Sequence, residues 1–325
     1  MTKTETRGFR QSLINRLANA LSPALIERLL PVLEARLEAH TRLQAHPRPD
    51  LPDINVYRAS PDAPFMRYST CNAEDFLHPE FRRLSDLILH PIFYHRKLWE
   101  FVFILHHAFR LGLLGEGKRA LGFGVGTEPL PAAFAAAGTD VTATDAPADL
   151  GVERGWTESN QLALGLASLP SGSLDRAAFE QKVQFEPCDM NAISDHLQDY
   201  DLCWSSCAYE HLGSIEKGLD FVVNSVEKTL KVGGVAIHTT EFNLTSNVET
   251  VDNSWTVLFR RRDFDRLSAM LRDRGHEVDA FVVAPNATPV DQFVDVPPYS
   301  SEPHLKLLLE NFTTTSAGII VRRGR

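Results

Sequence analysis

The sequence predicts an α/β fold with a doubly wound, mostly parallel seven-stranded sheet whose last strand is antiparallel, preceded by an N-terminal helical extension. From Arg119 onward, apolar runs typical of buried strands alternate with segments of helical length, which is the pattern of βαβ units and a parallel sheet. Near the C-terminus, two β-rich segments have no helix of the right length between them, which predicts an antiparallel hairpin closing the sheet. Before Arg119, apolar residues recur at helical spacing.

The N-terminal extension is predicted to contain two amphipathic helices. Apolar residues at positions 9–21 and 25–37 follow helical spacing, and Ser22-Pro23 between them provides an N-cap and a first helical residue. The segment is basic, so one alternative is that it lies on a membrane surface. We favour packing on its own domain or on a second subunit. The second case would make the protein a homodimer through these helices.

A proline-rich linker, residues 46–66, leads toward a helix predicted at Tyr94–Leu114. We therefore divide the chain into a helical lid with its linker, residues 1–92, and an α/β domain, residues 93–325. Strands of that domain are predicted at residues 119–124, 140–145, 183–189, 200–206, 234–242, 276–284 and 313–323. Helices are predicted at residues 129–137, 156–167, 193–196, 215–230 and 263–274.

The composition is that of a globular protein with a substantial core, since 43% of the 325 residues are hydrophobic and 23% are charged. A net charge of -9 disfavours nucleic acid as a partner. The four scattered cysteines indicate a reducing compartment. We expect no metal site, because Cys203 and Cys207 lack zinc-site spacing and a second ligand pair. With no membrane-spanning run and no signal peptide, we expect a cytoplasmic protein.

The stretch LGFGVGTE, residues 121–128, follows the first predicted strand and precedes a helix. Gly124 and Gly126 allow a tight turn that approaches a ligand closely. A dinucleotide-binding loop would have a third glycine where Pro129 stands, and Pro129 offers no N–H to a phosphate. Glu128 would repel a pyrophosphate and suits a ligand with an ammonium or sulfonium group. The alternative is that Glu128 only complements the dipole of the helix.

Acidic residues end the next two strands. Asp145 stands where a carboxylate can accept hydrogen bonds from both hydroxyls of a ribose. Asp189 can accept from an adenine amino group, and Met190 can pack on the ring. Each residue alone could be a turn former. Three consecutive strand ends that each carry a suitable group favour a ligand built from an adenosine and a cationic tail.

In these features the chain resembles the class I S-adenosylmethionine-dependent methyltransferases over Tyr94–Arg325. The glycine motif resembles residues 121–128, and DLCWSSCAYEHLG (201–213) and LKVGGVAIHTTEF (230–242) are similar to the segments that follow in that family. The resemblance implies S-adenosylmethionine as cofactor. The residues it assigns to cofactor binding are Phe123, Gly124, Gly126, Glu128, Asp145, Ala146, Asp189, Met190, Ser205 and Ser206.

One departure from the family concerns the acid that commonly precedes the glycine motif and holds the methionine ammonium. Gly122 stands at that position, and Glu128 or Glu100 is expected to replace the missing carboxylate. The loss also leaves open a catalytically silent relative that serves as a subunit. A nicotinamide-dependent dehydrogenase is a further alternative, against which Glu128 and Pro129 argue.

The predicted reaction is methylation of a small-molecule acceptor, with a hydroxyl of a sugar or glycan precursor as the first candidate and N- or C-methylation of a metabolite as the alternative. His211 is the first candidate for the general base, since its pKa suits proton removal near neutrality. Glu241 and His238 are the other catalytic candidates; His238 could instead be a core histidine. Arginines 260–262 would bind an anionic acceptor, or simply form a solvated charge run.

Overall fold

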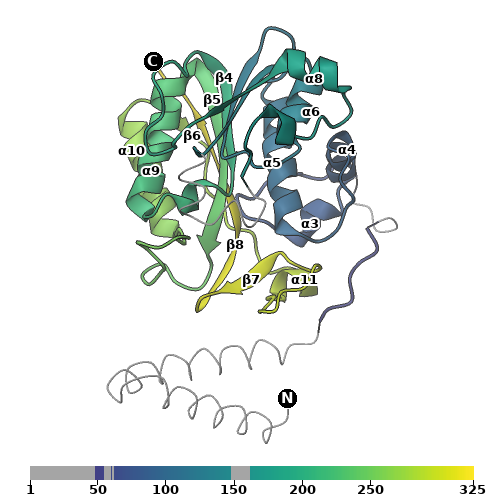
Figure 1. Cartoon of the computed structure of the whole chain (residues 1–325). Coiled ribbons are helices and arrows are strands. Elements are labelled where there is room, and N and C mark those ends of the chain that lie inside the picture. The colour runs from purple at the N-terminus through teal and green to yellow at the C-terminus, as the bar shows by residue number, and fades with distance from the viewer. Residues whose placement is uncertain (1–47, 55–59, 61, 148–161) are drawn as a thin grey trace, which may run out of the picture. The chain divides into compact units, whose positions relative to one another are not determined.

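The computed structural model describes residues 48–54, 60, 62–147 and 162–325. The chain divides into two compact units, Met1–Arg48 and Pro49–Arg325, and the labelled helices and strands of Figure 1 all belong to the second unit. The helices predicted within residues 9–37, and the homodimer expected through them, lie outside the described residues. So does the first half of the helix predicted at residues 156–167; in its second half, residues 162–165 are not helical and only a 3₁₀ turn begins at Leu166.

One mixed eight-stranded sheet organises the second unit (Figure 1). The strand order is β3-β2-β1-β4-β5-β8-β6, and β7 pairs with β8. β1 to β5 are mutually parallel, whereas β8 runs antiparallel to β5, β6 and β7. The order reverses between β1 and β4. The strands are β1 (Arg119–Phe123), β2 (Asp140–Asp145), β3 (Val183–Pro187), β4 (Tyr200–Ser206), β5 (Leu230–Asn243), β6 (Glu277–Val278), β7 (Lys306–Leu309) and β8 (Phe312–Arg322).

Helices cover both faces of the sheet, which confirms the predicted doubly wound fold class. Figure 1 shows α9 and α10 on one face and α5, α6 and α8 on the other. The helices are α3 (Ala73–Phe76), α4 (Pro79–Leu87), α5 (Arg96–Arg110), α6 (Leu130–Ala136), α8 (Arg176–Lys182), α9 (Ile215–Asn224), α10 (Arg261–Asp273) and α11 (Pro289–Gln292). Single turns of 3₁₀ helix lie at Leu166–Ser168 and Tyr209–His211, and a π-helical turn at Ser225–Thr229 continues α9.

Each face of the sheet has its own hydrophobic cluster, because successive side chains of a strand point to opposite faces. Leu202 and Trp204 of β4 belong to the cluster under α5 and α6. Cys203, between them, belongs to the cluster under α9 and α10. Both faces are closed by apolar packing, and the carboxyl ends of the parallel strands form one edge where loops can build a site.

Three local predictions differ from the structure. Residues 193–196 form a turn, not a helix, since so short a segment cannot meet the cost of helix nucleation. The strand expected at residues 276–284 shortens to Glu277–Val278. β7 is an additional strand, which the sequence did not predict because its run KLLL does not alternate polar and apolar residues. It joins β8 through a tight turn in which Glu310 has a positive φ of 54°.

The first turn of α5 is fixed against a distant part of the chain. The backbone N–H of Arg96 donates to the carbonyl of His304 (3.0 Å). His95 caps the helix, its Nδ1 accepting from the N–H of Lys97 at 3.1 Å. The side chains of Arg96 and Lys97 are therefore held at the carboxyl edge of the sheet.

Trp204 of β4 packs directly over Gly122 of β1. A Cβ added to Gly122 would lie 2.3 Å from Cζ2 of the Trp204 indole and 2.6 Å from Cγ1 of Val125. The indole also meets the ring of Phe134 edge-on, with centroids 4.9 Å apart. The residue at position 122 must therefore be glycine, because the space above it belongs to Trp204.

Gly122→Ala is expected to destabilise the fold by about 2 kcal/mol, because the added methyl overpacks a closed core. Gly165→Ala is the matched control, since a Cβ there has no atom within 4 Å. Urea unfolding of both variants beside the wild type measures the effect. Equal stability of the two variants would contradict this account of Gly122.

Candidate active site

A cavity of about 740 Å³ opens at the carboxyl ends of β1, β2, β4 and β5, where the strand order reverses. This position is the usual ligand site of an open α/β sheet, and the volume suits a small-molecule site. The wall that we call the glycine-loop wall is formed by Gly124, Val125, Gly126, Thr127, Glu128, Pro129, Asp145, Ala146, Leu162, Cys188, Asp189 and Met190. The opposite wall, called the β5 wall, is formed by His90, Arg96, Lys97, Phe101, Ser206, Cys207, Ala208, Glu210, His211, Leu212, Glu241, Thr256, Tyr299, His304, Leu307 and Leu309.

The glycine loop has the backbone that its sequence predicts. Gly124 and Gly126 have φ values of 59° and 50°, in the left-handed region that favours glycine. A Cβ at Gly124 would lie 2.8 Å from the Cβ of Ala208. The absence of side chains lets the loop pass close to the segment after β4, and both glycines line the cavity.

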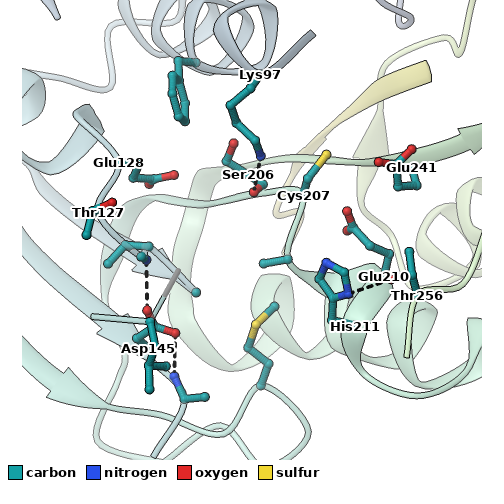
Figure 2. A pocket seen from close by; sticks show the side chains of 18 of the residues that line it. Lys97, Thr127, Glu128, Asp145, Ser206, Cys207, Glu210, His211, Glu241 and Thr256 are labelled. Atoms are coloured by element: carbon teal, nitrogen blue, oxygen red, sulfur yellow. Dashed lines mark hydrogen bonds between the residues drawn. The ribbon is translucent and has the colours of Figure 1, made fainter. Parts of the chain in front are cut away.

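Asp145 ties the glycine loop to the end of β2 (Figure 2). Its Oδ2 accepts the N–H groups of Gly126 and Ala163, both at 2.9 Å, and its Oδ1 accepts the N–H of Ala146 at 2.8 Å. Burial raises the pKa of Asp145, and these three N–H groups oppose the rise. A carboxylate oxygen accepts about two hydrogen bonds, so Oδ1 can still accept one from a ligand.

Asp189 and Met190 line the same wall as Asp145 and Ala146. Asp189 Oδ1 accepts the N–H of Asn191 at 2.9 Å, an Asx-type turn that fixes the carboxylate after β3. Two of the residues assigned to the cofactor do not reach the cavity wall. Phe123 and Ser205 are fully buried in the sheet, whereas Ser206 lines the cavity.

Glu128 lines the glycine-loop wall and is joined to Trp204. Its Oε1 accepts the indole N–H of Trp204 at 2.6 Å. Burial raises the pKa of Glu128 from 4.5 to about 8, although the bond from Trp204 acts in the opposite direction. The same indole that occupies the space above Gly122 thus orients the Glu128 carboxyl group.

Glu100, the other acid considered as a replacement, serves the core instead. It is fully buried and pairs with Lys97 at 2.6 Å, and it accepts hydrogen bonds from the hydroxyls of Ser206 and Ser316. Burial alone would raise its pKa, but the charges of Lys97 and Arg96 lower it to about 2. Of the two acids, Glu128 is the one that borders the cavity.

Glu210, His211, Glu241 and Thr256 lie together on the β5 wall (Figure 2). The Nδ1 of His211 is 2.9 Å from the carbonyl of Trp255 and 3.2 Å from the hydroxyl of Thr256. Glu210 accepts the hydroxyl of Thr240 at 2.9 Å. The structure therefore brings two of the three catalytic candidates, His211 and Glu241, to one region.

His238 is a core residue. Its ring nitrogens lie 2.9 Å from the Ser205 hydroxyl and 3.0 Å from the Ser225 hydroxyl. Burial lowers its pKa to about 3, so the ring is neutral near pH 7. His238 does not line the cavity, and its hydrogen bonds join β4, β5 and the π-helical turn.

The arginine run has structural partners outside the cavity. Arg260 pairs with Asp263 at 2.7 Å, closing a capping box at the start of α10, and Arg261 pairs with Asp265 at 2.9 Å. None of arginines 260–262 lines the cavity.

Within the described parts of the chain, no three His, Cys, Asp or Glu side chains form a group able to hold a metal ion. Nor is any helix in those parts long and apolar enough to cross a membrane.

Sequence reasoning missed Arg96, Lys97, Tyr299 and His304, all of which line the β5 wall. A signal was present for the first two. Basic residues in the first turn of a helix oppose the helix dipole, so an Arg-Lys pair at that place indicates acidic partners nearby. Tyr299 and His304 had no such signal, because their segment meets the site only through the tertiary fold.

Glu128→Gln is expected to make the ligand-free protein more stable relative to wild type as pH rises. A folded-state pKa near 8 lies above the unfolded value, so the wild type loses up to about 1.4 kcal/mol per pH unit between roughly pH 5 and 8. Glutamine keeps an oxygen for Trp204 and removes this loss. Urea unfolding at pH 6.0 and 8.0 measures it, with the exposed Glu116→Gln as control; a constant difference between Glu128→Gln and wild type would contradict the prediction.

Comparisons with known proteins give structural likeness only. No protein-family model matches the chain, and no curated protein matches it. Among solved structures, it is similar to phosphoethanolamine N-methyltransferase 2 of Haemonchus contortus (16% identity, TM-score 0.43, covering 75% of this chain and 57% of that one). It is also similar to an S-adenosylmethionine-dependent methyltransferase of Clostridium acetobutylicum (12% identity, TM-score 0.39, covering 75% of this chain and 97% of that one). A third similar structure is a glycopeptide N-methyltransferase bound to sinefungin (13% identity, TM-score 0.40, covering 68% of this chain and 92% of that one). Assignment of an activity therefore rests on the geometry of this chain.

Proposed function

We propose that this chain binds S-adenosylmethionine in the cavity and transfers its methyl group to a small-molecule acceptor. The observation that carries the proposal is the glycine-loop wall, where Asp145, Asp189 and Glu128 border one cavity that Gly124 and Gly126 also line. These groups match the ribose, the adenine amino group and the ammonium of that cofactor in kind, with Asp145 Oδ1 able to accept from one of the two ribose hydroxyls.

A dinucleotide fits the same wall poorly. α6 begins at Leu130, after Pro129, and a carboxylate borders the cavity just before it. A pyrophosphate needs free N–H groups and positive potential at a helix N-terminus. Pro129 removes one such N–H, and Glu128 offers an acceptor where the phosphate requires donors.

Each residue has a defined part in this proposal. The remaining acceptor capacity of Asp145 Oδ1 would bind the ribose, and Asp189 with Met190 would hold the adenine. Glu128 would bind the methionine ammonium in place of the acid missing at Gly122. When bound, the cofactor supplies a methyl group activated by a positively charged sulfur.

The β5 wall would receive and orient the acceptor. The cavity is large enough for the cofactor together with a small molecule, and closure around both would hold the reacting atoms in line and exclude water. A hydroxyl acceptor, with His211 as the base, is the first candidate from the sequence. An amine is the alternative.

The cofactor assignment predicts micromolar binding of S-adenosylhomocysteine and no binding of NADH, both measured by calorimetry. Asp145→Asn is expected to weaken S-adenosylhomocysteine at least about tenfold, because hydrogen bonds to a charged acceptor are lost. Asp140→Asn is the matched control, since Asp140 begins the same strand and its side chain pairs with Lys182 at the surface. Binding of NADH, or no binding of either S-adenosylhomocysteine or NADH, would reject the proposal.

A second measurement isolates Glu128. Glu128→Gln is expected to weaken S-adenosylhomocysteine about tenfold and to leave 5′-methylthioadenosine unchanged, because the latter lacks the amino-acid tail that Glu128 would contact. Glu116→Gln again serves as control. Equal effects on the two ligands would remove Glu128 from the ammonium site while leaving the cofactor assignment in place.

A further inference from the structure

One carboxylate oxygen on the β5 wall has no donor. Glu241, near the end of β5, is only 4% exposed and lines the cavity. Its Oε1 pairs with Arg96, whereas its buried Oε2 accepts no hydrogen bond from any described part of the chain. A buried oxygen that accepts no hydrogen bond has lost its contacts with water without replacement, which is unfavourable. A donor supplied by a bound molecule would remove that cost.

Arg96 fixes the direction of this carboxylate. The guanidinium is held at the first turn of α5 and contacts the Ser316 hydroxyl at 3.3 Å. It engages one oxygen of Glu241. The other oxygen is left for a ligand, and Figure 2 shows the Glu241 carboxylate on the same side of the cavity as that of Glu210.

Glu210 adds a second carboxyl group to the same wall. It is 1% exposed, and Thr240, the neighbour of Glu241 on β5, donates to its Oε2. Burial raises its pKa, the adjacent His211 opposes the rise and the charge of Glu241 adds to it. Among the described residues no lysine or arginine pairs with Glu210, since Lys97 is engaged by Glu100 and Arg96 by Glu241. Counting Glu100 behind the wall, three described acids share two cations, which leaves Glu210 as the acid without a cationic partner.

We propose that the methyl acceptor is a primary or secondary amine, whose nitrogen donates to Glu241 Oε2 and to Glu210. This inference rests on the proposed function and names its substrate class. A protonated amine brings positive charge and at least two N–H donors, which matches two acids. A hydroxyl brings one donor and no charge, so it would leave one of the acids without a partner.

The same pair also explains how the nitrogen becomes reactive. An ammonium has no lone pair, so one N–H bond must break with its electrons left on nitrogen and its proton passed to a base. The Glu210 carboxylate, adjacent to the bound nitrogen, accepts that proton. Glu241 keeps its pair with Arg96 and accepts a hydrogen bond from a remaining N–H.

The test uses matched amine and alcohol probes on the full-length protein, with and without saturating S-adenosylhomocysteine. Ligand-observed NMR compares benzylamine with benzyl alcohol and glucosamine with glucose. Only the amines are expected to bind. Glu241→Gln should weaken them at least about tenfold, because a charge-assisted hydrogen bond is lost. The exposed Glu249→Gln should change nothing.

Two further controls separate the possible failures. Glu241→Gln must still bind S-adenosylhomocysteine, which shows that it folds, and Glu210→Gln, which can keep the bond from Thr240, should also weaken the amines. Alcohols binding as well as amines, or no amine binding to protein that binds S-adenosylhomocysteine, would overturn the amine proposal alone. Amine binding that depends on Glu241 in a protein that ignores S-adenosylhomocysteine would preserve the amine site and overturn the methyltransferase.

Discussion

The contact between Trp204 and Gly122 is the constraint on which the site depends. The indole lies where a side chain at position 122 would project, so β1 and β4 can approach only if β1 has glycine there. The indole N–H then needs an acceptor because the ring is buried. Glu128 supplies that acceptor at 2.6 Å. Core packing thereby decides where the acid of the glycine loop stands.

A single helix turn supplies the cations that pair with two acids at the opposite wall. Arg96 and Lys97, consecutive residues at the start of α5, pair with Glu241 and Glu100 respectively. A buried ion pair contributes little net stability unless its geometry is well satisfied. Here both pairs are supported by hydroxyl groups, with Ser316 contacting Arg96 and Glu100. The arrangement holds the ends of β4, β5 and β8 in fixed relation to the cavity.

Local signals in the sequence were sufficient for the fold class and for the glycine-loop wall. Periodicity located the parallel strands, and Asp145 and Asp189 are visible because they end strands whose carboxyl edges must meet. Long-range contacts were not visible. The bond from Trp204 to Glu128 joins residues 76 positions apart, and the placement of His304 beside α5 comes only from packing. His238 and Glu241 lie three residues apart in β5, so their side chains point to opposite faces of the sheet. His238 is a core residue, because its ring is bonded to buried hydroxyl groups.

Glu128 and Glu241 show how one residue type can serve two ends of a cavity in two settings. Glu128 is buried against an indole with no cation paired to it in the described residues, so its neutral form is favoured near pH 7. Glu241 is also buried but pairs with the guanidinium of Arg96. A cation that binds at Glu128 must displace a proton, whereas a cation that binds at Glu241 meets a carboxyl group that already has a cationic partner. The environment of a bound cation therefore differs between the two ends, through burial at one and through Arg96 at the other.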